Sequence, residues 1–283
     1  MIITTSLNYA NGDLHLGHLV EEIRADIFAR YKRLMKEDVT FLSGADMHGT
    51  PIMIKAAQLG MDPMEYTMQY YASHKKTFDK YLISHDVFGH THTEANQALA
   101  ENVFSVCKEK GYIYTKVIEQ LYDEEAGQFL PDRYVKGDCP NCGAADQYGD
   151  CCEVCGSHYD AMELNNVRSV LSDSTPVVKE TMHYYFKLSA FQTELKAWVD
   201  RSTIQDTVKH WLNDWLTKGL KDWCISRDAP YYGFKIPGSM QECGADKYFY
   251  VWLDAPLGYM SILSETNKEN LSKNSVRFWW TFS

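Results

Sequence analysis

The sequence of 283 residues has no run of about 18 apolar residues, and no basic segment followed by a short apolar one. The first absence argues against a membrane-spanning helix, and the second argues against a secretory signal peptide. Positive charge is also scarce, because 38 acidic against 28 basic residues give a net charge of -10. That balance argues against a uniformly basic surface for nucleic acid, while a local basic face remains possible. We expect a cytoplasmic protein.

Disulfides are not needed for a core, because a globular chain of this size buries roughly 75% of its unfolded surface. Four of the eight cysteines instead form two CxxC pairs separated by residues 143–151. Thiolates suit tetrahedral zinc, and each pair is followed by a glycine that a tight knuckle requires. The predicted ligands are Cys139, Cys142, Cys152 and Cys155. Four sulfur ligands leave no open position, so one structural zinc ion is expected.

Three alternatives remain for these cysteines. The pairs could be redox-active, or the site could have lost its metal. The neighbouring Cys151 could compete as a ligand, although its spacing to Cys155 is CxxxC. A zinc ribbon that binds nucleic acid is disfavoured, because Cys139–His158 contains more acidic than basic residues and no basic stripe.

The first third of the chain alternates strand and helix patterns. The pattern predicts strands at 1–7, 38–46 and 86–93, and helices at 15–35, at 63–82 and from Thr93 to just before Gly111. Such alternation is typical of parallel βαβ units, whose ligands bind at the carboxyl ends of the strands. The segments 8–18 and 44–50 are predicted loops that follow strands, where such a site is expected.

The middle of the chain has a different character. Residues 112–165 are rich in Gly, Cys, Asp and Tyr, which predicts short strands and tight turns. Two amphipathic helices follow, and strand-like sequence returns from Trp223 and continues through "KYFYVWLDAPLGYM". We therefore predict an insertion that splits a nucleotide-binding fold. The predicted division is 1–111 (first half), 112–222 (insertion, with the zinc knuckle at about 136–165), 223–263 (return) and 264–283 (divergent tail).

Two histidines stand at the start of the first predicted helix. His15 and His18 are three residues apart and can share a helix face. A helix N-terminus offers partial positive charge and free N–H groups to a phosphate, and Gly17 would allow an adenine ring to approach closely. An ordinary helix cap or a metal-binding pair explains the same spacing.

Two further motifs suggest a small-molecule site. Asp46 ends a strand and could receive an ammonium group, or it could simply cap a loop. Four residues near the end of the chain could wall an apolar pocket, although aromatic residues at such spacing usually form core. They are Trp252, Ala255, Pro256 and Tyr259.

The motifs "HLGH", "GADMHGTPI", the double CxxC, "WCISRDAPYYGFKIP" and "YVWLDAPLGYM" occur in this order. The series resembles the methionyl-tRNA synthetases, class I aminoacyl-tRNA synthetases of the bacterial type with a zinc-bearing insertion. The resemblance extends from Met1 to about Met260. It implies an α/β fold, a class I Rossmann-type parallel sheet interrupted by a zinc-knuckle connective insertion.

The resemblance also implies a reaction. Methionine and ATP, with Mg, would give methionyl-adenylate and pyrophosphate, and the methionyl group would pass to tRNA(Met). His15 and His18 would be the catalytic residues, donating to phosphoryl oxygens as their charge grows. Glu21 would lie near the ribose. The implied ATP site comprises Asn11, Gly12, His15, Gly17, His18 and Glu21.

The implied methionine site places Asp46 at the ammonium group. The thioether would contact an apolar wall, with its sulfur against aromatic rings. The wall residues are Leu7, Tyr9, Trp252, Ala255, Pro256 and Tyr259. One methylene is worth roughly 1–3 kcal/mol in such a pocket, so norleucine should compete. Arg227 and Asp228 resemble scaffolding at the return from the insertion.

Parts of the family pattern are missing. The sequence has no KMSKS loop, and the second half of the catalytic fold and the helical anticodon-binding domain are absent. The segment "LSKNS" near Ser272 lacks the leading lysine. We expect a truncated or frame-shifted product or a fragment, with an uncovered strand edge and apolar face that favour self-association. A catalytically inactive fragment that binds methionine or nucleotide is the alternative function.

One departure lies beside the predicted pocket. Asn8 stands where the family usually has proline, and we expect it to loosen the backbone there.

Overall fold

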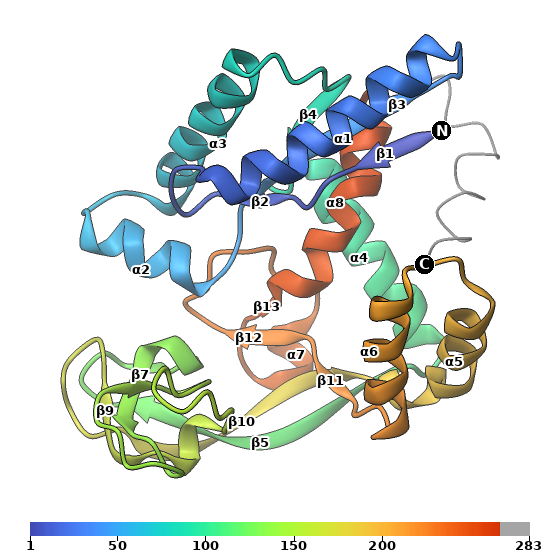
Figure 1. The fold of residues 1–283 in the computed structure, drawn as a ribbon. Coiled ribbons are helices and arrows are strands. Elements are labelled where there is room, and N and C mark those ends of the chain that lie inside the picture. Colours follow the sequence, from blue (N-terminus) through green and yellow to red (C-terminus); the bar gives the residue numbers. More distant parts are fainter. Residues whose placement is uncertain (267–283) are drawn as a thin grey trace. The chain divides into compact units, whose positions relative to one another are not determined.

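The computed structural model describes residues 1–266 and contains two compact units (Figure 1). The first unit contains Met1–Glu101, Tyr231–Phe234 and the segment that begins at Val251. The second contains Asn102–Pro230 and Lys235–Tyr250. Most of the predicted tail at 264–283, with the "LSKNS" segment, lies outside the described residues.

A parallel sheet forms the centre of the first unit. Its strands are β1 (Ile2–Thr4), β2 (Asn8–Tyr9), β3 (Thr40–Asp46) and β4 (Val87–His90). β1 and β2 pair in succession with one edge of β3, and β4 pairs with the other edge, all in parallel. Within residues 1–266, β1, β2 and β4 each pair with β3 alone. The predicted parallel α/β architecture is confirmed.

The helices of this unit largely follow the sequence pattern. They are α1 (Leu16–Leu34), α2 (Thr50–Gln58), α3 (Pro63–Lys80), α4 (Glu94–Glu109), which continues into the second unit, and α8 (Val251–Thr266). Asp62 caps α3 by accepting from the backbone N–H of Met64 at 2.8 Å. The short helix α2 was not predicted. Its start is marked by Gly49 as N-cap and a proline in its first turn.

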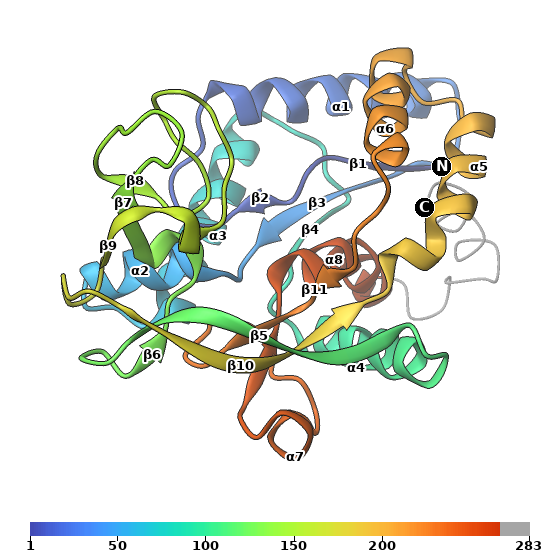
Figure 2. The ribbon, with the colours of Figure 1, turned by 90° about the horizontal axis from the view of Figure 1, so that it is seen from below.

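Alternating side chains of β3 point to opposite faces of the sheet, and helices cover each face (Figure 2). Phe41 packs with α1 and α3 on one face, and Leu42 packs with α8 on the other. Two glycines allow α8 to lie close to the sheet. A Cβ at Gly44 or Gly89 would come within 2.9 Å or 2.7 Å of the Ile262 side chain. The sheet is therefore covered on both faces, as parallel sheets require.

The expectation of strand-like sequence through Met260 is wrong beyond Phe249. β13 (Lys247–Phe249) is a short strand, and α8 begins at Val251. Asp254, Gly258 and Ser261 are buried, and their spacing of four and three residues is helical. The aromatic and β-branched composition suggested a strand, but the residues that become buried recur at helical spacing.

The second unit is built on a long antiparallel pair, β5 (Ile113–Asp123) with β10 (Val177–Phe186), conspicuous in Figure 2. The prediction of short strands is therefore wrong for 113–123. β6 (Gln128–Phe129) and β11 (Trp223–Cys224) extend this sheet. The other elements are β7 (Val135–Asp138), β8 (Gln147–Tyr148), β9 (Asn165–Ser169), β12 (Ser226–Asp228), α7 (Ser239–Cys243), and the 3-10 helices Asp132–Tyr134, Ala161–Glu163 and Leu188–Phe191.

The two amphipathic helices predicted in the insertion are present as α5 (Gln192–Arg201) and α6 (Asp206–Thr217). Val199 and Leu216 pack together with Leu220 in the cluster between them. Trp211 is 67% exposed, and its ring stacks on Trp215 with centroids 6.4 Å apart. The apolar stripe predicted for α6 is thus only partly buried.

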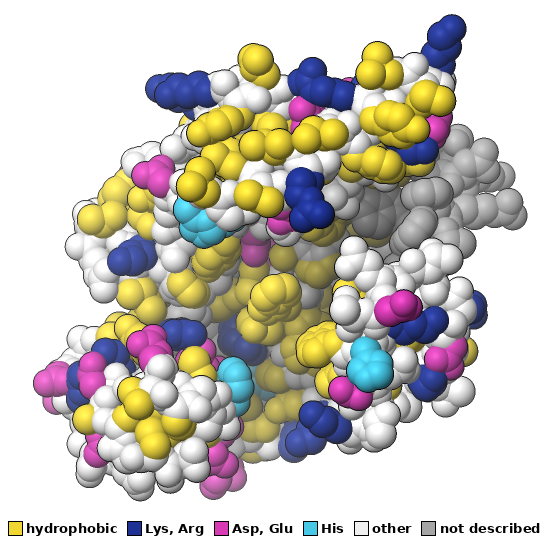
Figure 3. Space-filling view, viewed as in Figure 1, with side chains coloured by type: hydrophobic (Ala, Val, Ile, Leu, Met, Phe, Trp, Pro, Cys, Tyr) yellow, Lys and Arg dark blue, Asp and Glu magenta, His cyan; other side chains and the backbone are white. Residues whose placement is uncertain are grey.

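An exposed apolar stripe runs along α1 and is visible in Figure 3. Its members share one helix face and are Leu16 (76% exposed), Val20 (54%), Ile27 (62%), Tyr31 (52%) and Leu34 (81%). We call this surface the α1 stripe. It belongs to an outer helix face and not to the sheet, so the expected association through an uncovered apolar face stays a prediction. No helix within residues 1–266 combines the length and apolar character that a membrane span needs.

Candidate functional site

The two predicted motif segments lie side by side at the carboxyl end of β3. Tyr9 on β2 is the register partner of Asp46, and the N–H of Ala10 donates to the Asp46 carbonyl at 2.8 Å. The prediction of a loop at 44–50 needs correction, because 44–46 belongs to β3 and α2 begins at Thr50. The expected location at the strand ends is confirmed.

His15 and His18 lie together at the start of α1. His15 is the N-cap, and its Nδ1 accepts from the N–H of Gly17 at 3.1 Å. The Nδ1 of His18 accepts from the N–H of His15 at 3.2 Å, and the rings stack with centroids 3.8 Å apart. The capping alternative is therefore present. A Cβ at Gly17 would lie 2.8 Å from the His15 ring, so glycine is needed for this cap.

The cap fixes how the two rings can interact with a ligand. A neutral imidazole whose Nδ1 accepts must carry its proton on Nε2. Burial, followed by the neighbouring His15, lowers the pKa of His18, which favours the neutral ring at pH 7. Each ring then has an Nε2–H donor beside a helix N-terminus, where an anion is stabilised. Capping and phosphate binding are thus compatible.

The turn at Asn11 and Gly12 is held by α3. The hydroxyl of Tyr66 donates to the Asn11 carbonyl at 3.0 Å, and Nε2 of His74 lies 2.8 Å from the Gly12 carbonyl. Neither α3 residue was predicted as part of the site. Their sequence distance from the turn left no local signal.

The neighbouring acids of α1 have different roles. Glu21, predicted near the ribose, is exposed and accepts from the backbone N–H of Ser6 at 2.7 Å and from its hydroxyl at 2.6 Å. Glu22 is buried, and it accepts from Asn8 Nδ2 at 3.2 Å and contacts His85 Nε2 at 2.8 Å. The expectation that Asn8 loosens the backbone is wrong, because its side chain is bonded and its backbone pairs with β3.

Asp46 combines a buried carboxyl oxygen with a raised pKa. Its Oδ1 is buried and has no hydrogen-bond partner among the described residues. Burial raises the pKa of Asp46 well above its ordinary value, and the charge of Asp254 adds to the rise. A cation placed at this oxygen would lower the pKa of Asp46 again, because it favours the charged carboxylate.

The predicted apolar wall lies along one face of α8. Trp252 is 64% exposed, Pro256 is exposed, and Ala255 and Tyr259 are half-buried. These four residues are therefore not simple core, which was the alternative. The N–H of Leu7 donates to the Tyr259 hydroxyl at 3.2 Å, which joins this face to the segment that precedes β2.

In the second unit the four predicted zinc ligands converge. All four Sγ atoms lie within 4.8 Å of one another, with 3.8 Å between Cys139 and Cys155 and 3.7 Å between Cys142 and Cys152. A tetrahedron with Zn–S bonds of about 2.3 Å has edges of about 3.8 Å, so the residues fit zinc. Cys151 is not part of this group.

Among the four predicted zinc ligands, Cys155 has a pKa that favours the thiolate form at pH 7. Hydrogen bonds from the side chain and backbone of Ser157 lower the pKa of Cys155 to about 5. A deprotonated sulfur is the form that binds a metal ion.

Comparison with known proteins decides the family. The family described as tRNA synthetases class I (M) matches residues 1–283. The chain belongs to this family. The methionyl-tRNA synthetase of Mycobacterium tuberculosis bound by methionyl-adenylate shares the fold, with a TM-score of 0.71 and 23% identity over 98% of this chain. A second structure of that synthetase with methionyl-adenylate has a TM-score of 0.70 and 23% identity over 98% of this chain.

This class I synthetase chain spans about half the length of those proteins, because the matches cover 49% of each. At that identity the likeness shows the fold. The roles assigned to individual site residues therefore stay predictions.

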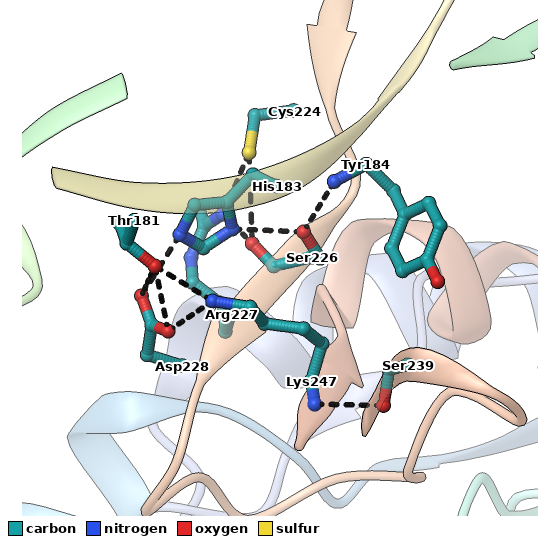
Figure 4. A network of polar contacts seen from close by, with 9 residues as sticks. All are labelled: Thr181, His183, Tyr184, Cys224, Ser226, Arg227, Asp228, Ser239 and Lys247. Carbon is teal, nitrogen blue, oxygen red and sulfur yellow. Dashed lines mark hydrogen bonds and ion pairs between the residues drawn. The ribbon is translucent and has the colours of Figure 1, made fainter. Parts of the chain in front are cut away.

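Arg227 and Asp228 behave as the predicted scaffolding (Figure 4). The Asp228 carboxylate contacts His183 Nε2 at 2.8 Å, accepts from the Thr181 hydroxyl at 3.1 Å, and pairs with Lys247 Nζ. Arg227 donates to the Ser226 carbonyl at 2.8 Å. These groups link β10, β12 and β13 within the second unit.

Proposed function

We propose that the first unit activates methionine as part of a methionine–tRNA ligase. The buried Oδ1 of Asp46, which has no hydrogen-bond partner among the described residues, carries this proposal, because the ammonium group of an amino acid offers it a charged donor. The half-exposed apolar face of α8 and the two Nε2–H donors at the start of α1 supply complementary chemistry for a side chain and for phosphates. The methionyl-adenylate bound by the fold relatives is consistent with both.

In this proposal Asp46 holds the methionine ammonium, and the apolar wall with Leu7 and Tyr9 contacts the thioether. The methionine carboxylate attacks the α-phosphate of ATP, and a P–O bond to pyrophosphate breaks as the new P–O bond forms. His15 and His18 donate from Nε2 to phosphoryl oxygens whose charge grows in the transition state. Mg would accompany ATP. The four cysteines hold structural zinc, which supplies no chemistry to the reaction.

Transfer of the methionyl group to tRNA(Met) is part of the same proposal by family membership. The alternative is binding of methionine or nucleotide without turnover. A cytoplasmic location stays a prediction.

Methionine-dependent ATP–pyrophosphate exchange tests the proposal, with calorimetric binding of methionine measured in parallel. The informative variant is His15→Asn with His18→Gln, because asparagine keeps the N-cap and removes the Nε2 donor. We expect exchange in the natural chain, and a loss of at least about a hundredfold in the variant with methionine binding retained. Binding without exchange would establish the alternative, and absence of both would contradict the proposal.

A further inference from the structure

A chain of three polar side chains, two of them buried and one half-buried, lies close to Asp46. His48 is fully buried, and its Nδ1 contacts Oδ2 of Asp254 on α8. Its Nε2 lies 2.7 Å from Nδ1 of His92, which follows β4. We call this the Asp254–His48–His92 chain. It connects the ends of β3 and β4 with α8.

Aromatic rings enclose the chain. The His92 ring stacks on Tyr232 and Phe234 with centroids 5.5 and 5.6 Å apart. The His48 ring meets the same two rings edge-on at 5.4 and 4.6 Å. In such water-poor surroundings electrostatic interactions are stronger than in solvent.

The proton positions follow from the partners. Burial, with the neighbouring His48 and His90, lowers the pKa of His92 to about 4, so this ring is neutral at pH 7. An ionised Asp254 accepts from Nδ1–H of His48, and Nε2 of a neutral His48 ring then accepts from Nδ1–H of His92. Both protons point toward the carboxylate, and they stabilise its charge.

Asp254 nevertheless keeps one oxygen unused. Its Oδ1, like Oδ1 of Asp46, is buried without a hydrogen-bond partner among residues 1–266. Each such oxygen destabilises the fold unless a donor meets it. Two of them, from β3 and from α8, are acceptor atoms that a group with several N–H donors would satisfy.

We propose that the Asp254–His48–His92 chain holds Asp254 as a second carboxylate for a primary ammonium group, beside Asp46. The inference rests on the proposed function and adds residues to its methionine site. His48 and His92 are positioning residues, because they act through Asp254. Packing alone would explain the ring contacts, but it would give no preference for a charged amine.

Several titratable groups face this site. They are Asp46 on β3, His48 after it, His90 on β4, His92 after that strand, Tyr232, and Asp254 and Tyr259 on α8. The two carboxylates are the acids among them. Affinity for an ammonium ion should therefore rise with pH as Asp46, whose pKa is raised, loses its proton.

Calorimetry with two ligands tests the inference. The ligands are methionine and 4-(methylsulfanyl)butanoate, which has the same side chain and carboxylate but no amine. In Asp254→Asn we expect methionine affinity to fall about tenfold or more and the butanoate affinity to stay within about twofold. His48→Gln should likewise lower the affinity for methionine and leave the affinity for the butanoate nearly unchanged. His85→Gln is the matched control, because His85 is also a buried histidine on a carboxylate, 2.8 Å from Glu22. It should leave both affinities unchanged.

The outcomes separate the two hypotheses. If the natural chain binds methionine and Asp254→Asn binds it equally well, or weakens both ligands equally, the inference is wrong and the proposed function stands. If the natural chain binds neither ligand, the proposed function fails, and the inference fails with it. Should Asp254→Asn not fold, His48→Gln decides. It must lower methionine affinity about tenfold or more and leave butanoate affinity within about twofold, and equal losses for the two ligands would overturn the inference.

Discussion

Asp46 in the first unit and Asp228 in the second are largely buried acids with opposite electrostatics. Burial opposes the charge of Asp228, but His183 and Lys247 outweigh it and lower its pKa. Burial and the Asp254 charge raise the pKa of Asp46, whose Oδ1 has no described partner. One charge is satisfied by the fold, and the other is available to a ligand. Asp228 should therefore stabilise the fold in its charged form, whereas a charged Asp46 should destabilise it unless a ligand supplies a partner.

The largest effect should come from removing zinc from the second unit. Apparent binding free energies of structural zinc are roughly 10–16 kcal/mol in finger peptides, so the strands β7 to β9 should lose order on chelation. Hydrogen exchange over residues 135–169 would measure this, together with metal content of one ion per chain. Cys142→Ser should lose the ion and Cys151→Ser should keep it. Unchanged protection after chelation would contradict the structural role.

Asp228→Asn should remove the charge that pairs with Lys247 and His183. It leaves Lys247 buried beside a neutral group, and breaking a buried pair in this way costs about 3–5 kcal/mol. Urea unfolding monitored by tryptophan fluorescence would measure the loss. A stability equal to that of the natural chain would show that the network in Figure 4 contributes little.

The same network predicts a pH dependence. The lowered pKa of Asp228 means that its stabilisation is present above its unfolded value of 3.8 and is lost as pH falls. Burial opposes the charge of His183, yet Asp228 raises the pKa of His183 above its ordinary value of 6.5. The stabilisation by charged His183 is therefore complete below pH 6.5 and is lost as pH rises through the pKa of the folded state. Stability should therefore be greatest between these limits, and Asp228→Asn should flatten the profile.

Asp46→Asn should change stability in the opposite direction and make the protein more stable. Because the folded-state pKa is raised, ionisation of Asp46 opposes folding, and this cost grows as pH rises from the unfolded toward the folded value. The variant should gain roughly 1–3 kcal/mol at pH 7 and lose methionine binding. Thermal unfolding and calorimetry would measure both. A destabilised variant would show that Asp46 has a structural partner.

The smallest effect on stability should come from the α1 stripe. Replacing Ile27 and Leu34, 62% and 81% exposed, with lysine should change stability by less than about 0.5 kcal/mol. It should also reduce self-association of the chain in sedimentation velocity. A natural chain that stays monomeric at high concentration would refute the predicted association.

The sequence predicted features that depend on local spacing. The zinc ligands were predicted from the CxxC pairs, and the start of α1 from His15 and its helical periodicity. The position of segments 8–18 and 44–50 at the strand ends followed from the rule for parallel sheets. Contacts between distant segments could not be predicted, since His48 and Asp254 are 206 residues apart. The helix α8 was missed because its aromatic residues lie on an open face and suggested a strand.

The central claim is that Asp46 keeps a costly charge available for a substrate ammonium. Carbon-13 NMR of the aspartate carboxyl groups, assigned with Asp46→Asn, would follow its titration with and without saturating methionine. We expect a pKa above the ordinary value in the free chain, and a fall on methionine binding because the ammonium favours the carboxylate. An ordinary pKa in the free chain, or one that methionine leaves unchanged, would contradict the claim.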